Sequence, residues 1–272
     1  MTRQELCEAR ISTAGRGAPG RAHHDYPAQA DFVRRHVAAL GGWLELPDLA
    51  SSVEALVAHD DLKLHIEAMV QDVAFFRTKR WEGLLAFGLY RVTLYALTRA
   101  LNATSVIETG VLHGLSSIFI LQAMLESRGR PRLISIDWPS TYRDGPSNRD
   151  GFTDTLPPGQ TPGWIIGDRY RDLWDLRLGR SVELLRGAVA QLGTLDLFIH
   201  DSEHTDETMT FEFETAWGAL RRGGLLVADN IDANTAFFDF SRAVQRVPFV
   251  MPRDPDQRVP GDPGIRFGLI RK

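Results

Sequence analysis

Four acidic residues stand at the ends of short apolar runs in the second half of the chain, and they are the residues best placed to do chemistry. They are Glu108, Asp137, Asp201 and Asp229. If the runs are parallel strands, their carboxyl ends share one edge of a sheet, where open α/β folds bind ligands. A single acid in such a place can equally cap the next helix. Four in succession predict a shared binding edge.

Three of the side chains at this edge could hold a metal ion. Asp201, Asp229 and Asn230 offer hard oxygen ligands that suit Mg²⁺ or a similar cation with open positions for water and substrate. Such an ion would lower the pKa of a bound hydroxyl and align it for reaction. His204 could act as a general base near neutral pH, with metal ligation or a helix-start hydrogen bond as its alternative role. His200 is expected in the core.

The first acid opens a glycine-containing turn, Glu108-Thr109-Gly110-Val111-Leu112-His113-Gly114-Leu115-Ser116. Gly110 permits a sharp turn, and Gly114 lets a helix start close to the strand with its free N–H groups toward a ligand. Leu112 replaces the middle glycine of the dinucleotide fingerprint, so a nucleotide cofactor without a pyrophosphate fits better. Asp137 is placed to take both hydroxyls of a ribose. A structural turn and a helix cap are the alternative interpretations.

A parallel sheet is needed to position these residues. After residue 104, apolar runs at 106–107, 133–136, 195–199 and 225–228 alternate with amphipathic stretches. This alternation predicts buried parallel strands covered by helices on both faces. Two further apolar runs, Phe249–Met251 and Ile265–Ile270, predict an antiparallel hairpin at one edge.

One of the intervening helices has a complete sequence signal. Asp206 and Glu207 would lie in its first turn, and an apolar stripe runs from Met209 to Leu220. Arg221, Arg222 and Gly223 are expected to end it.

The chain divides by composition into three parts. Residues 1–26 are rich in Gly, Ala and Arg without periodicity and predict a flexible leader. Residues 27–103 carry apolar side chains at helical spacing, Tyr90 among them, and predict a helical N-terminal cap. Residues 104–272 would form the cofactor-binding domain. The cap and the Pro- and Gly-rich loop at 139–167 are candidates for a lid that excludes water.

Bulk composition narrows the classes of partner. The net charge of −4 comes without long basic runs, so we expect no nucleic-acid partner. Cys7 is the single cysteine, which excludes an intramolecular disulfide and favours a reducing, cytoplasmic compartment. No stretch has membrane-spanning length, so no membrane association is expected. The helical N-terminal region is compatible with a homodimer.

From Glu108 to about Asp232 the chain resembles class I S-adenosylmethionine-dependent methyltransferases. The ExGxxxGxS turn is similar to that of the catechol O-methyltransferase-like and macrocin O-methyltransferase-like enzymes. This resemblance implies a Rossmann-like α/β fold with a seven-stranded, mostly parallel sheet, a final antiparallel hairpin strand and an N-terminal helical extension. It places around the cofactor, from methionine to ribose and adenine, Glu108, Gly110, Gly114, Ser116, Asp137, Ser181 and Asp201.

The strand ends at Asp201 and at Asp229-Asn230 resemble those of metal-dependent small-molecule O-methyltransferases, with His204 where that family can carry a lysine. The resemblance implies transfer of a methyl group to a hydroxyl of a small acceptor, a sugar or a phenolic natural product, assisted by Mg²⁺ and His204. Two alternatives stay open: a metal-independent methyltransferase that uses His204 alone, and a non-catalytic S-adenosylmethionine-binding protein. A nicotinamide-dependent oxidoreductase is disfavoured by Leu112.

Overall fold

The computed structural model covers the N-terminal helices, the sheet and the helices that flank it. The predicted leader at 1–26 lies almost wholly outside the described residues, as does most of the predicted loop at 139–167. None of the helices described is both long enough and apolar enough to cross a membrane. The residues described are 26–71, 83–138, 156–255 and 265–272.

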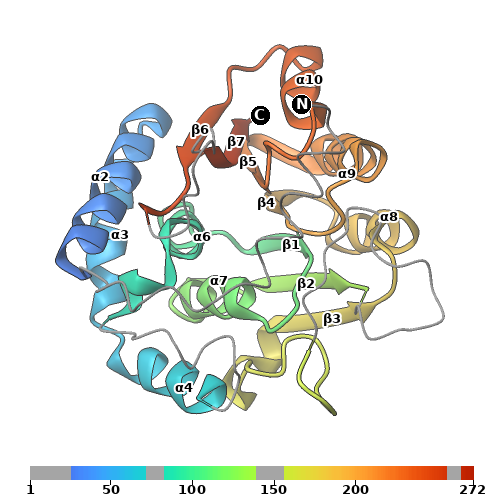
Figure 1. Ribbon diagram of the computed structural model, residues 1–272. Coiled ribbons are helices and arrows are strands. Elements are labelled where there is room, and N and C mark those ends of the chain that lie inside the picture. Colours follow the sequence, from blue (N-terminus) through green and yellow to red (C-terminus); the bar gives the residue numbers. More distant parts are fainter. Residues whose placement is uncertain (1–25, 72–82, 139–155, 256–264) are drawn as a thin grey trace, which may run out of the picture.

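A seven-stranded sheet forms the middle of the molecule, with strand order β3-β2-β1-β4-β5-β7-β6 (Figure 1). The five strands from β3 to β5 pair in parallel, whereas β7 runs antiparallel to both β5 and β6. The predicted Rossmann-like sheet and its antiparallel hairpin are therefore confirmed. The strands are β1 Ser105–Thr109, β2 Arg132–Asp137, β3 Trp174–Leu178, β4 Leu195–His200, β5 Leu220–Asp229, β6 Phe249–Pro252 and β7 Ile265–Arg271.

Helices cover both faces of this sheet (Figure 1). One face carries α6 and α7, with α2 and α3 packed outside α6, and the opposite face carries α8, α9 and α10. The helices are α2 Tyr26–Leu44, α3 Asp48–Val57, α4 Asp60–Val70, η1 Leu84–Phe87, α6 Leu89–Ala100, α7 Leu115–Leu125, η2 Asp168–Leu173, α8 Ser181–Leu192, α9 Asp206–Ala219 and α10 Ala236–Ala243.

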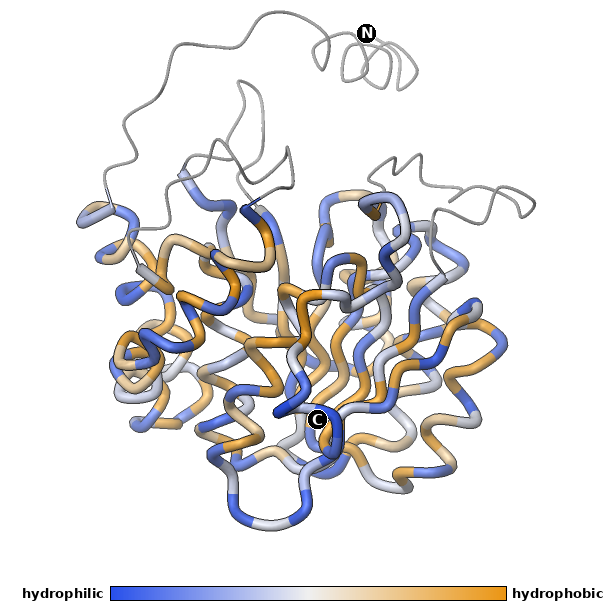
Figure 2. Tube along the Cα trace, turned by 90° about the horizontal axis from the view of Figure 1, so that it is seen from below, coloured by the Kyte–Doolittle hydropathy of each residue, from blue (hydrophilic) through white to orange (hydrophobic). Residues whose placement is uncertain are grey.

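Alternation along the buried strands divides the core into two layers. Val106 and Leu197 belong to the layer beneath α6 and α7, whereas Ile107 and Phe198 belong to the layer beneath α8, α9 and α10. Successive strand side chains point to opposite faces, so a continuous apolar run fills both layers at once. Figure 2 shows the result as hydrophobic segments through the middle of the molecule and hydrophilic segments on many outer turns.

Two elements differ from the sequence prediction. Strand β3 was not predicted, because it is half-buried at the sheet edge and has no apolar run. Helix α9 begins at Asp206 as expected, but the prediction that Arg221–Gly223 end it is wrong, since β5 already begins at Leu220. Leu220 pairs with Leu195 of β4, and the arginine after it donates to Asp196 at 2.5 Å. This long-range pairing overrides the local helical signal.

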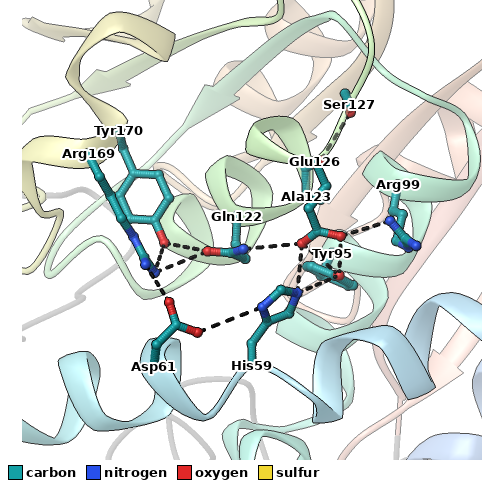
Figure 3. A network of polar contacts seen from close by, with 10 residues as sticks. All are labelled: His59, Asp61, Tyr95, Arg99, Gln122, Ala123, Glu126, Ser127, Arg169 and Tyr170. Atoms are coloured by element: carbon teal, nitrogen blue, oxygen red, sulfur yellow. Dashed lines mark hydrogen bonds and ion pairs between the residues drawn. The ribbon is translucent and has the colours of Figure 1, made fainter.

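A polar network ties the N-terminal helices to α7 (Figure 3). Glu126, directly after α7, accepts hydrogen bonds from Tyr95 at 3.0 Å and from Arg99 at 2.8 Å, both of α6. Its carboxylate also lies 2.9 Å from His59, the residue before α4. Tyr95 is fully buried, so its hydroxyl depends on this network for a partner. The network continues through Gln122, Arg169, Tyr170 and Asp61.

We expect Glu126→Ala to lower the free energy of unfolding by about 2 kcal/mol, because a buried hydroxyl loses its charged acceptor. In the background of Tyr95→Phe the same substitution should cost clearly less, because that donor is gone. Urea denaturation measures both. Exposed Glu214 of α9 provides the control, since Glu214→Ala should change little. Equal losses with and without the Tyr95 hydroxyl would contradict this assignment.

Candidate active site

The register of the sheet brings the predicted acids to one edge. Thr109 of β1 lies opposite Ile136 of β2 and His200 of β4, and His200 lies opposite Ala228 of β5. The backbone N–H of Asp201 donates to the carbonyl of Thr109 at 2.8 Å. Each of the three aspartates directly follows one of these aligned residues: Asp137, Asp201 and Asp229.

The glycine turn after β1 packs directly on the end of β4. Gly110 has φ +85°, and a Cβ there would lie 1.9 Å from the carbonyl oxygen of Asp201, so only glycine fits. Gly114, immediately before α7, has φ +91°, and a Cβ there would lie 2.8 Å from Cα of Gly163. Ser116 lies in the first turn of α7 and is 9% exposed. The turn and the helix start are therefore held at fixed positions beside Asp201.

Asp137 holds the shape of this turn. Its Oδ2 accepts hydrogen bonds from the backbone N–H of Val111 at 3.0 Å and of Leu112 at 2.7 Å. Leu112 adopts φ +49°, an uncommon conformation for a branched side chain. Burial raises the pKa of Asp137, and the two backbone donors partly offset that effect. The same carboxyl group could thus support the turn with one oxygen and offer the other to a ribose.

Glu108 is fully buried beneath the turn. Ser117 of α7 and Ser135 of β2 donate to its Oε2 at 2.6 Å and 2.9 Å. Its Oε1 is buried and has no hydrogen-bond partner among the described residues. Burial raises the pKa of Glu108 to about 7, although the two hydroxyl donors act in the opposite direction. The side chain therefore braces strand against helix, and its role toward the methionine part of the cofactor stays a prediction.

Beneath the same edge lies a second buried carboxylate, Glu212 of α9, which the sequence analysis did not identify. It accepts hydrogen bonds from Thr109 and Ser202, each at 2.6 Å, and lies 2.7 Å from Nδ1 of His200. The hydroxyl of Ser181, at the start of α8, bonds it as well. Burial would raise the pKa of Glu212, but His200 and these donors lower it overall. His200 is thus buried in the core as predicted, and Ser181 faces this cluster.

His204 lies at the rim between two of the predicted residues. Its Nε2 is 3.8 Å from Oδ1 of Asp201 and 3.2 Å from Nδ2 of Asn230. Asn230 adopts φ +47°, which asparagine tolerates better than most residues, and this turns its amide toward the histidine. The ring centroid of His204 lies 5.2 Å from that of His200. The His204 ring is therefore held at the edge of the sheet beside Asp201 and Asn230.

The oxygens predicted to hold a metal are engaged by an arginine. Nη2 of Arg266, on β7, donates to Oδ2 of Asp229 at 2.5 Å, and Nη1 bonds Oδ1 of Asn230. Burial and then the charge of the neighbouring Asp229 raise the pKa of Asp201 well above its usual value, and Oδ1 of Asp229 is buried without a hydrogen-bond partner among the described residues. Among the residues described, no group of three or more His, Cys, Asp or Glu side chains could hold a metal ion. This arrangement does not fit the predicted magnesium site.

Helix α6 adds two polar side chains that the sequence analysis did not assign to the site. Tyr90 is 7% exposed, and its ring lies edge-on to that of Phe267 with centroids 5.0 Å apart. The hydroxyl of Tyr90 and Nε of Arg91 are buried without a hydrogen-bond partner among the described residues. Burial and the charges of Asp201 and Asp229 raise the pKa of Tyr90 well above its usual value. In the sequence, the helical spacing of Tyr90 predicted only that it packs in the core of the N-terminal helices.

The C-terminal hairpin holds the start of α6. Asp254, just after β6, accepts hydrogen bonds from the backbone N–H of Leu89 at 3.0 Å and from Nε2 of Gln29 at 2.6 Å. Gly88 before the helix has φ +95°, and a Cβ there would lie 2.9 Å from the Asp254 carboxylate. The hairpin therefore positions both Arg266 and the helix that carries Tyr90.

On the cofactor side, the indole N–H of Trp164 donates to Nδ1 of His113 at 2.9 Å. This bond holds the side chain of His113, which is itself part of the glycine turn. It also anchors the segment that begins at residue 156 to the glycine turn.

The comparisons agree with the geometry. Residues 107–231, from β1 past the end of β5, match the model of a family described as a methyltransferase domain. No curated protein matches the sequence. The fold is similar to that of an O-methyltransferase from Bacillus cereus in complex with SAH, with a TM-score of 0.50 at 12% identity over 88% of this chain and 100% of that one. It is also similar to cofactor-bound Rv0187 from MTB, with a TM-score of 0.50 at 16% identity over 83% and 96% of the two chains.

At these identities the likeness to solved structures shows the fold. The family match describes residues 107–231 as a methyltransferase domain, and this stretch spans the strands that carry the predicted site. The protein therefore carries a methyltransferase domain on a Rossmann-like fold.

Glu108→Gln should make stability less dependent on pH. The pKa of Glu108 is raised from 4.5 to about 7 in the folded protein, so its stabilising contribution is complete below the unfolded value and is lost as pH rises through the folded value. As pH rises from about 4.5 to about 7, the free energy of unfolding of the wild type should fall by on the order of 3 kcal/mol because of this group. The Glu108→Gln variant should not show this loss. Urea denaturation at about pH 5 and about pH 8 measures the difference. Glu214→Gln is the control and should keep the pH dependence of the wild type. If wild type and Glu108→Gln differ in free energy of unfolding by the same amount at both pH values, the raised pKa is contradicted.

Proposed function

We propose that the enzyme transfers the methyl group of S-adenosylmethionine to a hydroxyl oxygen of a small molecule, with His204 as general base. The observation that carries this proposal is the packing of Gly110 on the backbone of Asp201. It joins the predicted cofactor turn to the strand end that presents His204. Methyl donor and base are thereby held on adjacent parts of one edge.

The role of each residue follows from the chemistry of methyl transfer. The acceptor oxygen attacks the methyl carbon as the bond from carbon to sulfur breaks, which requires the oxygen, carbon and sulfur atoms to lie in line. His204 takes the proton of the hydroxyl as the new bond forms, and S-adenosylhomocysteine leaves. In this proposal the turn at 108–116 and Asp137 hold the cofactor, with Ser181 near the adenine. Asp201 positions His204.

The magnesium ion predicted from sequence is not part of this proposal, because Arg266 already bonds oxygens of Asp229 and Asn230. The metal-independent alternative, with His204 as base, is supported by that contact.

The acceptor is proposed to be a small metabolite with a phenolic or sugar hydroxyl, such as a natural product. The lack of long basic runs supports a small acceptor over a nucleic acid. A cytoplasmic location and a homodimer remain proposals, supported by the single cysteine and by the helical N-terminal region.

Asp137→Asn should weaken binding of S-adenosylhomocysteine by about tenfold or more, because a charged acceptor for the ribose is lost. The asparagine carbonyl can still accept the two backbone hydrogen bonds that shape the turn. Calorimetry measures the affinity. Asp239→Asn, which removes an exposed ion pair on α10, is the matched control and should bind like wild type. A wild-type protein that binds neither S-adenosylmethionine nor its demethylated product would overturn the proposal.

His204→Ala should lower turnover by about 10²- to 10⁴-fold with little change in affinity for S-adenosylhomocysteine, because the base acts on the acceptor. Turnover is followed as S-adenosylhomocysteine release with a panel of catechols, other phenols and sugars. His36→Ala on α2, where the ring bonds the backbone carbonyl of Phe32 on the same helix at 2.7 Å, serves as control and should retain turnover. An active His204→Ala protein would remove the general base from the mechanism.

A further inference from the structure

The ends of β4 and β5 bring two carboxyl groups and a cation together. Asp229 is 1% exposed along its side chain, and its Oδ1 is buried without a hydrogen-bond partner among the described residues. The charge of Asp229 acts on Asp201, and neighbouring carboxylates repel each other unless a proton or a cation lies beside them. Asn230 adds a third oxygen to the same place. The sequence pattern predicts a divalent metal ion for this position, since these are the oxygens that such an ion prefers.

The structure supplies a different cation. The guanidinium of Arg266 bonds Asp229 with one terminal nitrogen and Asn230 with the other, so one planar group spans two of the three predicted metal ligands. An arginine side chain is not deprotonated in proteins, so this group carries a positive charge beside Asp229. Its side chain is 27% exposed, and a guanidinium has five N–H donors, more than these two bonds use.

Backbone geometry places Arg266 there. β7 pairs antiparallel with β5, and Asp229 lies opposite Phe267, the residue after the arginine. The carbonyl of Arg266 accepts the N–H of Ile231 at 3.3 Å. These contacts hold the two strands together on either side of the ion pair. The cation is therefore part of the sheet and needs no separate binding step.

We infer that Arg266 is a built-in cation that fills the position of a divalent metal. Methyl transfer in this protein then takes place beside a guanidinium and not beside a metal ion. This inference rests on the proposed function, because it concerns the charge beside the acceptor oxygen. Arg266 would neutralise the negative charge that develops on that oxygen as its proton moves to His204. Asp229 and Asn230 position the guanidinium.

Mn²⁺ binding followed by electron paramagnetic resonance tests the inference without an acceptor. Wild type should bind Mn²⁺ weakly. Arg266→Met keeps an extended side chain without the charge, and should bind Mn²⁺ at least about tenfold more tightly, because the oxygens are then open to a hard cation. Arg266→Lys keeps the charge and should resemble wild type. Arg253→Met provides the matched control, since Arg253 forms the Arg253–Asp232 ion pair at 3.2 Å after β6 and should give no gain.

The gain in Arg266→Met should disappear when Asp229→Asn is added, which locates the new ion at these oxygens. If Arg266→Met fails to fold by circular dichroism, Arg266→Gln makes the same comparison. Tight Mn²⁺ binding by wild type that Asp229→Asn abolishes would overturn the inference. So would a folded Arg266→Met or Arg266→Gln protein without any gain, because the oxygens would then not form a cation site.

A separate measurement keeps the two proposals distinguishable. If wild type fails to bind S-adenosylhomocysteine, the proposed function fails, while the Mn²⁺ comparison still decides what Arg266 does at the strand ends. Turnover of wild type with an accepted hydroxyl compound should stay within about twofold in excess EDTA. Loss of turnover in EDTA and recovery on addition of Mg²⁺ would overturn the inference even with the proposed function intact.

Discussion

The contact between Gly110 and the backbone of Asp201 is the constraint on which the rest of the site depends. The carbonyl of Asp201 approaches Gly110 so closely that no side chain fits there, and the N–H of Asp201 bonds Thr109 one residue earlier. A rigid backbone contact thus joins the turn predicted to hold the cofactor with the strand end that leads to His204. Methyl transfer depends on alignment, so this contact bears directly on the proposed reaction.

Buried negative charge is the second constraint, and the fold balances each carboxyl group in a different way. Glu108 has a raised pKa and two serine donors, whereas Asp137 accepts two backbone N–H groups. Glu212 pairs with a buried histidine. Asp229 is paired with Arg266. Each solution satisfies the rule that a buried charge needs a partner, a donor set or a proton.

Helix α6 connects the N-terminal region to the reactive edge. Two polar side chains of α6 donate hydrogen bonds to Glu126, which lies directly after α7. Asp254, after β6, accepts a hydrogen bond from the first backbone N–H of α6. The helix carries Tyr90 next to the carboxylates at the ends of β4 and β5. The N-terminal helices therefore have a structural link to the site through one well-held element.

The sequence alone determined the parallel sheet, the hairpin and the acids at the strand ends, because buried strands and glycine turns leave local patterns. It could not find β3, which lacks an apolar run, or the early end of α9, which depends on pairing between Leu220 and Leu195. Tertiary structure alone decided the partners of the acids. Arg266 meets Asp229 only through antiparallel pairing of strands distant along the chain, and local spacing carries no information on such a pair. An Asp-Asn sequence is the same whether a metal ion or an arginine lies beside it.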